Sequence, residues 1–224
     1  MSASLEILYV DDEVAVINKA SGLIVHRGWA QDRVVAMTLL RDELGRYVYP
    51  VHRLDRSTSG ALLFALSPAS ARALQQQFTE QSIQKVYLAL TRGITPERGQ
   101  IDHPLARDKD SEAKAARTDF VRIATFERYS LVEARPHTGR LHQIRRHFKH
   151  LSHPLIGDVR YGKGEHNRLF RTRFNLHRLA LHATSIQFRH PKDGRTLHIQ
   201  APLPLDLAQA FAAMKLPFGS NSPA

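Results

Sequence analysis

A short polar segment at residues 51–60, VHRLDRSTSG, holds one carboxylate, Asp55, between two arginines, Arg53 and Arg56. The residues after Asp55 are serine, threonine and glycine, which favour turns, so one explanation is that the aspartate caps a turn and pairs with an arginine. A chemical explanation is that a basic surface gathers a polyanion and that Asp55 acts on it as a nucleophile or a base. The segment alone leaves both explanations open.

The basic charge that the second explanation needs is present and concentrated. The 224-residue chain has a formal net charge of +11 and a pI near 10.3. Between Arg135 and Arg178, eleven lysines and arginines stand against two acidic residues, Asp158 and Glu165, so +9 of the charge lies there. Such a segment is typical of nucleic-acid-binding proteins, and arginine, the more frequent basic residue here, suits bidentate contact with phosphate. A basic surface that serves only solubility is the alternative.

A helix is expected after Gly139, because apolar residues recur there at steps of three, four and three. These residues are Leu141, Ile144, Phe148 and Leu151. At about 100° per residue, Arg145 lies roughly 80° from the centre of this apolar stripe and Arg146 roughly 180° from it. We therefore expect Arg145 at the margin of the core, where a guanidinium needs an anionic partner, and Arg146 on the solvent side, where it can contact phosphate. The alternative for Arg145 is a side chain that reaches to solvent without a role.

Metal and cofactor chemistry is not favoured by the motifs. His142 and His147 are five residues apart, a step that does not align on a helix, and no carboxylate lies among the histidines of residues 142–153. The chain has no cysteine, HExxH pattern, P-loop or GxGxxG motif, and it lacks the GxSxG elbow of many serine hydrolases. We expect neither a metal nor a cofactor, and we expect these histidines to cap a helix, lie in the core or contact RNA.

The composition predicts a soluble cytoplasmic protein. No stretch approaches the roughly 18 apolar residues of a membrane helix. The N-terminus, MSASLEILYVDDE, is acidic and lacks the basic and apolar regions of a secretory signal. We expect a monomer that binds nucleic acid and no membrane.

Apolar runs and turn signals predict an α+β fold, in which helices and loops flank a largely antiparallel mixed β-sheet. Strands are expected at residues 5–10, 14–18, 61–66, 85–91, 117–125, 129–135, 179–189 and 195–200. Helices are expected at residues 34–44, from Pro68 with Ser67 as its N-cap, and at residues 205–214, with a loop at residues 106–115. We expect one catalytic domain over residues 1–214 and a loose tail at residues 215–224.

Several motifs in combination resemble the signatures of the RluA-type pseudouridine synthase family, and they extend from about Leu5 to about Met214. The matching segments are residues 52–55 (HRLD) with 58–60 (TSG), 18–22 (NKASG), 85–87 (KVY), 116–120 (ARTDF), 139–145 (GRLHQIR), 153–158 (HPLIGD) and 181–183 (LHA). Ala20 stands where the family's turn usually has proline. The layout, with residues 25–29 (VHRGW), is most similar to the TruC-type tRNA enzymes of the family.

The resemblance implies the pseudouridine synthase fold and an isomerase that converts uridine in RNA to pseudouridine. Asp55 would be the ionised catalytic carboxylate, as nucleophile or as base. Tyr87 would stack on the uracil after it is flipped out of the helix, and Arg145 would be the active-site cation that keeps Asp55 charged. The residues implied to bind RNA are Arg53, Arg56, Arg140, His142 and Arg146.

By the same resemblance the substrate is tRNA, at a T-arm uridine that has position 65 in tRNA numbering, and ribosomal RNA is the alternative. A non-catalytic RNA-binding protein on the same scaffold is the competing hypothesis from another class. It would lack Asp55, Tyr87 or Arg145, and all three are present. A nuclease would need clustered carboxylates to hold metal, whereas Asp55 is the one carboxylate that we assign to the site.

Overall fold

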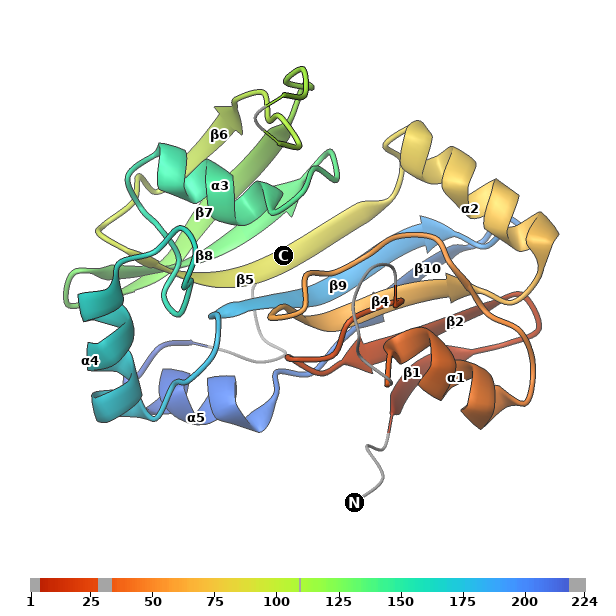
Figure 1. Cartoon of the computed structure of the whole chain (residues 1–224), viewed down its shortest axis with the longest axis horizontal. Coiled ribbons are helices and arrows are strands. Elements are labelled where there is room, and N and C mark those ends of the chain that lie inside the picture. Colours follow the sequence, from red (N-terminus) through yellow and green to blue (C-terminus); the bar gives the residue numbers. More distant parts are fainter. Residues whose placement is uncertain (1–4, 28–33, 109, 218–224) are drawn as a thin grey trace. The chain divides into compact units, whose positions relative to one another are not determined.

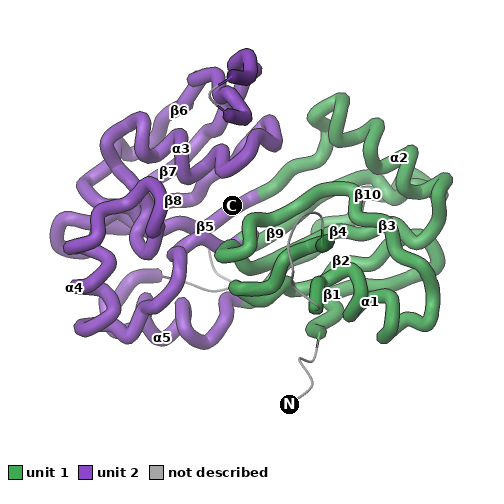
Figure 2. Tube along the Cα trace, viewed as in Figure 1, with its two compact units in different colours: residues 1–85, 183–202 green, residues 86–182, 203–224 purple. Residues whose placement is uncertain are grey.

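The fold was analysed in a computed structural model that describes residues 5–27, 34–108 and 110–217. The chain forms two compact units, shown in green and purple in Figure 2. The first unit contains residues 1–85 and 183–202, and the second contains residues 86–182 and 203–224. The chain passes from one unit to the other within strands β5 (Gln84–Arg92) and β9 (Leu181–Arg189), and again after Pro202.

The first unit is built on a mostly antiparallel sheet. Its strands β1 (Glu6–Val10), β2 (Val14–Lys19), β4 (Ser59–Ala65) and β9 lie side by side in that order, β10 (Thr196–Gln200) pairs with β9, and the short β3 (Tyr49–Pro50) pairs with β4. The strands predicted at residues 5–10 and 14–18 are confirmed, and they pair with each other as an antiparallel hairpin. Its turn is closed by Asp11, whose Oδ1 accepts the N–H groups of Glu13 and Val14, both at 2.9 Å.

Both faces of the central strands of this sheet are buried. On one face, Val16 and Leu63 pack in a cluster with Leu74 of helix α2 (Pro68–Thr79), while Ile17 and Phe64, which point the other way, are also fully buried. The predicted start of α2 is confirmed, because the Ser67 side chain caps the helix by accepting the N–H of Ser70 at 3.1 Å. The predicted helix α1 (Ala36–Leu44) is also present.

The second unit has an antiparallel sheet with helices on both faces (Figure 1). Its strands are β5, β8 (Tyr129–Pro136), β7 (Arg117–Phe126) and β6 (Arg98–Asp102), in that order. Leu90 and Leu131 pack on one face with helices α4 (Gly164–Phe174) and α5 (Leu205–Ala213). Helix α3 (Gln143–His150) packs on the other face. There the rings of Phe148 and Phe120 make an edge-to-face contact, with 5.3 Å between their centres.

The predicted α+β class with a mostly antiparallel sheet is thus confirmed, whereas some local predictions were wrong or incomplete. Strands β3 and β6 and helix α4 were not predicted. Leu141 does not belong to the apolar stripe of α3, because it is 39% exposed. The reason is that His142 adopts a left-handed conformation (φ 53°), so the helix begins only at Gln143.

At the C-terminal end, Leu216 is 4% exposed and packs in the core of the second unit, although it belongs to the segment predicted to be loose. Residues 218–224 of that segment lie outside the described residues, as do Gly28 and Trp29 of the VHRGW motif. Among the described residues, no helix has the length and apolar character needed to cross a membrane.

Candidate active site

Asp55 lies in the loop between β3 and β4 of the first unit and is half-buried. Its carbonyl oxygen accepts the N–H of Thr58 at 3.0 Å, which closes a turn over residues 55–58. Leu54 is buried and anchors the loop (5% exposed), whereas Arg53 and Arg56 are exposed. Both arginines that we predicted to bind RNA from this loop therefore lie at the surface of their unit.

A buried lysine holds the backbone that follows Asp55. Lys19, the last residue of β2, is fully buried, and its Nζ donates to the backbone carbonyls of Ala20 (2.8 Å), Leu23 (2.7 Å) and Arg56 (3.3 Å). An ammonium group is tolerated in a protein interior only when such acceptors replace its water shell. The lysine of the NKASG motif is therefore a structural cation that fastens the Asp55 loop to the neighbouring turn.

The NKASG turn makes two more hydrogen bonds to the same loop. The N–H of Gly22 donates to the carbonyl of Arg56 at 2.8 Å, and Ser21 Oγ donates to the carbonyl of Ser57 at 3.0 Å. Gly22 has φ +90°, a conformation that side chains disfavour. These bonds fix the turn even though Ala20 lacks the constraint of the family's usual proline.

Gly60 follows the Asp55 loop and allows β4 to lie against β9. It has φ +114°, and a Cβ atom placed on it would lie only 2.1 Å from the carbonyl oxygen of Ala183. The glycine of the TSG segment is therefore explained by packing, because no larger residue fits between the two backbones.

His52, the first residue of the HRLD motif, is a structural residue in this unit. Its Nε2 accepts the N–H of Leu63 at 3.0 Å, and its ring lies 5.1 Å from that of Phe78. Burial, with a smaller effect of the Lys85 charge, lowers the pKa of His52 to about 3. Burial also lowers the pKa of Lys85 to about 8. His52 is therefore neutral near pH 7 and is a poor candidate for the base of a hydrolase triad.

Tyr87 lies on β5 in the second unit, where it is 8% exposed and pairs with Ala134 of β8. Residues directly opposite one another in antiparallel strands point to the same face, and Ala134 is in turn opposite Phe120 of β7. Phe120 contacts Phe148 of α3. Tyr87 and α3, the helix that carries Arg145, therefore share one face of this sheet.

Arg145 is buried (7% exposed) and forms a bidentate ion pair with Asp158. Its Nε donates to Asp158 Oδ2 at 2.8 Å, and its Nη2 donates to Oδ1 at 2.9 Å. We expected an anionic partner for Arg145 at the margin of the core, and Asp158 is such a partner. Asp158 lies in the HPLIGD motif, and it is a carboxylate beside a predicted site residue that we had not assigned to the site.

The loop after β8 and α3 is shaped to hold Asp158. Asp158 Oδ1 also accepts the N–H groups of Arg160 (2.9 Å) and Tyr161 (3.0 Å). Burial raises the pKa of Asp158, but these hydrogen bonds and the Arg145 charge outweigh it and leave the pKa below its ordinary value. The carboxylate therefore stays ionised. Gly157 permits this loop, because a Cβ on it would lie 1.9 Å from the Arg178 carbonyl oxygen.

Gln143 fixes the turn that leads into α3. Its Oε1 accepts Thr138 Oγ1 (2.6 Å) and the N–H of Arg140 (3.0 Å), and its Nε2 donates to the Arg117 carbonyl and to Thr118 Oγ1, both at 3.0 Å. The glutamine of the GRLHQIR motif is thus a structural link between α3 and β7 that places the following arginines.

The three remaining predicted RNA-binding residues have different environments. Arg140 is exposed, and its Nε donates to the Ala115 carbonyl at 3.0 Å. His142 is half-buried, and its Nδ1 lies 3.0 Å from the hydroxyl of Tyr161. Arg146 is half-buried, and its Nη1 donates to the Ala106 carbonyl at 2.7 Å. Arg146, which we expected on the solvent side of the helix, is thus only partly exposed, because it reaches back to the loop before β7.

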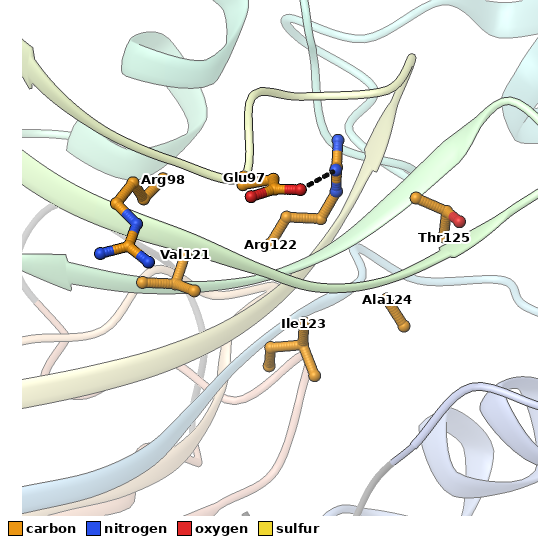
Figure 3. A pocket seen from close by; sticks show the side chains of 7 residues that line it. All are labelled: Glu97, Arg98, Val121, Arg122, Ile123, Ala124 and Thr125. Atoms are coloured by element: carbon orange, nitrogen blue, oxygen red, sulfur yellow. Dashed lines mark ion pairs between the residues drawn. The ribbon is translucent and has the colours of Figure 1, made fainter.

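A hollow of about 370 Å³ on β7 lies apart from these motifs. Glu97, Arg98 and residues 121–125 line it, and Figure 3 shows the ion pair between Glu97 and Arg122 (3.7 Å) at its edge. The hollow contains none of the predicted site residues. In the part of the chain that the structure describes, no three histidine, aspartate or glutamate side chains are grouped to hold a metal ion.

Comparison with known proteins gives consistent matches. Residues 13–150 match the family model described as RNA pseudouridylate synthase. The chain is 44% identical over 221 residues to tRNA pseudouridine synthase C of Haemophilus ducreyi, covering 89% of this chain and 91% of that protein. It is 43% identical over 235 residues to the protein of the same name from Pasteurella multocida, covering 93% and 96% of the two chains.

The fold is shared with solved structures. Human RNA Pseudouridylate Synthase Domain Containing 1 superposes with a TM-score of 0.75 at 30% identity, covering 94% of this chain and 87% of that chain. Human RNA Pseudouridylate Synthase Domain Containing 4 superposes with a TM-score of 0.79, covering 96% and 95%, at 24% identity. The family model and the sequence identity together place this chain in the RNA pseudouridylate synthase family.

Proposed function

We propose that this protein is a tRNA pseudouridine synthase, an isomerase that converts one uridine of its RNA substrate to pseudouridine. The observation that carries the proposal is the 44% identity, along 89% of the chain, to a protein named tRNA pseudouridine synthase C. The finer proposal, from the TruC-type resemblance, is a T-arm uridine at position 65.

The reaction exchanges one bond to the ribose for another. The bond between uracil N1 and ribose C1′ breaks, the base turns, and C5 bonds to C1′. C5 then loses its proton and N1 gains one, so that atoms and charge balance. Because the base must turn, the nucleotide has to leave the stacked helix and enter a pocket.

We assign the carboxylate of this reaction to Asp55, acting as nucleophile or base. The assignment is supported by the HRLD motif and by the rigid support that Lys19 gives to the loop. Tyr87 is assigned to stacking on the flipped uracil, because an aromatic ring binds a base face without requiring charge.

Arg145 is assigned as the active-site cation. Its Nε and Nη2 are held by Asp158, which fixes the plane of the guanidinium. A cation positioned in this way needs no reorganisation when charge develops during the reaction, which is the most effective form of electrostatic catalysis.

The test is pseudouridine mapping with purified protein and unmodified transcripts of tRNA and ribosomal RNA. Pseudouridines are detected by carbodiimide labelling and primer extension. The proposal predicts one new stop in tRNA, in the T arm, and none with Asp55→Asn. Modification of ribosomal RNA alone would overturn the tRNA assignment, and absence of modification in every RNA would overturn the activity.

A further inference from the structure

Three cations surround the ring of one tyrosine in the second unit. The Arg145 guanidinium carbon lies 5.2 Å from the centre of the Tyr161 ring, that of Arg160 lies 5.5 Å from it, and Lys149 Nζ lies 5.9 Å from it. Tyr161 is half-buried, whereas Lys149 and Arg160 are exposed. The cations come from α3 and from the loop that follows it, so the fold gathers them from separate segments.

The charges in this cluster do not balance. Asp158 is the nearby carboxylate, and both of its oxygens are engaged by Arg145. Among the described residues, neither Lys149 nor Arg160 has a carboxylate within ion-pair distance. The face of an aromatic ring attracts an exposed cation by only about 0.5–1 kcal/mol, which does not neutralise two of them.

We propose that Lys149 and Arg160, gathered at the ring of Tyr161, bind a phosphate group in the backbone of the RNA substrate. This inference rests on the proposed function. Arginine offers a planar fork that matches two phosphate oxygens, and lysine adds a mobile point charge. A phosphate between them would supply the negative charge that the cluster lacks.

The same ring connects this phosphate site to the candidate active site. Tyr161 contacts Arg145 through its face, and its hydroxyl lies 3.0 Å from His142 Nδ1. The backbone N–H groups of Arg160 and Tyr161 donate to Asp158, the partner of Arg145. A phosphate bound by Lys149 and Arg160 is therefore held by α3, which carries the candidate catalytic cation, and by the loop that positions it.

RNA fits this surface better than a membrane or a protein partner does. Val159 is the exposed apolar residue of the loop (81% exposed), whereas Arg160 and Lys163 of the same segment, and Lys149 near the Tyr161 ring, are exposed and basic. A surface of this kind neutralises phosphates and releases their counterions. It offers no broad apolar face for a membrane surface.

The test measures tRNA affinity against salt concentration for Lys149→Ala, Arg160→Ala and the double variant. The matched control is Arg98→Ala, which removes an exposed arginine of β6 at the edge of the β7 hollow. Removing one lysine or arginine that binds a phosphate should reduce the slope of log K against log salt by about 1. We expect this reduction in each single variant and about twice as much in the double variant.

Single-turnover rates at saturating RNA separate binding from chemistry. The site predicts weaker tRNA binding by Lys149→Ala and Arg160→Ala, so the rate of each variant should fall more at subsaturating RNA than at saturating RNA. Slopes equal to that of wild type, or lowered no more than by Arg98→Ala, would overturn the phosphate site. If the wild-type protein modified no RNA, the proposed function would be overturned. The slopes of log K against log salt for wild type and variants would still test the phosphate site.

Discussion

Single residues carry the chemistry, and Arg145 shows how one side chain combines a structural and a proposed catalytic role. Its bidentate bond to Asp158 is buried, so removal of one partner leaves the other as an uncompensated charge. Such a loss costs about 3–5 kcal/mol of stability. A loss of activity in Arg145→Ala alone would therefore not show whether the fold or the chemistry had failed.

A double variant separates the two roles. Arg145→Ala should lose stability and, by analogy with the loss of one preorganised electrostatic group, on the order of 100-fold in turnover. Adding Asp158→Asn should restore much of the stability, since the orphaned charge is gone, without restoring turnover. Urea unfolding and single-turnover assays measure the two quantities. Recovery of both together would mean that Arg145 acts only through the fold.

Arg146→Ala serves as the neighbouring comparison. This variant loses one hydrogen bond, to the Ala106 carbonyl, so we expect about 1 kcal/mol less stability and nearly normal turnover.

His52 predicts a specific pH dependence of stability. Its pKa is about 3 in the folded protein, against an ordinary value of 6.5. Between these values the unfolded chain binds more protons, so the free energy of unfolding should fall as the pH is lowered below about 6.5. The slope from this group is at most about 1.4 kcal/mol per pH unit.

Urea unfolding at about pH 7 and pH 5 measures this effect for wild type and for His52→Gln. The variant should lose less stability between the two pH values, whatever its stability at pH 7. If the loss of stability between the two pH values were the same in the variant as in wild type, His52 would not be a neutral side chain with a lowered pKa.

At the scale of elements, two glycines predict opposite effects of the same substitution. Gly60 has φ +114°, and its Cβ would collide with the Ala183 backbone where β4 meets β9. Gly164 begins α4 without positive φ, and the nearest atom to its Cβ would be Arg168 Nη1 at 3.8 Å.

Gly60→Ala should therefore destabilise the protein by about 2 kcal/mol or more. Gly164→Ala should stabilise it by about 0.4–1 kcal/mol, because alanine has less freedom to lose on folding. Thermal melting of both variants provides the comparison. A Gly60→Ala protein as stable as wild type would contradict the close approach of the two strands.

The elements also show what the sequence could predict. β2 and β4 were predicted because their apolar runs are continuous, as expected for strands buried on both faces. Helix α4 was missed because three arginines interrupt its few core residues, of which Phe170 is fully buried. β6 was missed because it is a short strand at the sheet edge, with Ile101 as its buried apolar residue.

The candidate site likewise contains residues that the sequence could predict and contacts that it could not. Asp55, Tyr87 and Arg145 could be proposed from motifs that are local in sequence. The pairing of Arg145 with Asp158, and the bond from Lys19 to the Arg56 carbonyl, depend on contacts between separate segments. Periodicity within one segment carries no information on such contacts, so the structural reasons for the NKASG and HPLIGD motifs emerged only from the fold.

At the scale of the whole molecule, the net charge of +11 predicts strongly salt-dependent RNA binding. The slope of log K against log salt is roughly −0.7 for each phosphate neutralised in single-stranded RNA. With four or more contacts from the segment between Arg135 and Arg178, the slope should be about −3 or steeper. Filter binding of tRNA over a range of salt concentrations measures it, and a slope near zero would exclude this segment as the binding surface.

The central claim is that Asp55 isomerises a uridine in tRNA. The most direct measurement is single-turnover formation of pseudouridine in a tRNA transcript by wild type and by Asp55→Asn, with folding and tRNA affinity measured on the same samples. We predict one modified T-arm uridine with wild type, and a folded Asp55→Asn protein that binds tRNA but forms no pseudouridine. Turnover of Asp55→Asn within about tenfold of wild type, which is about 1.4 kcal/mol in barrier height, would contradict the assignment.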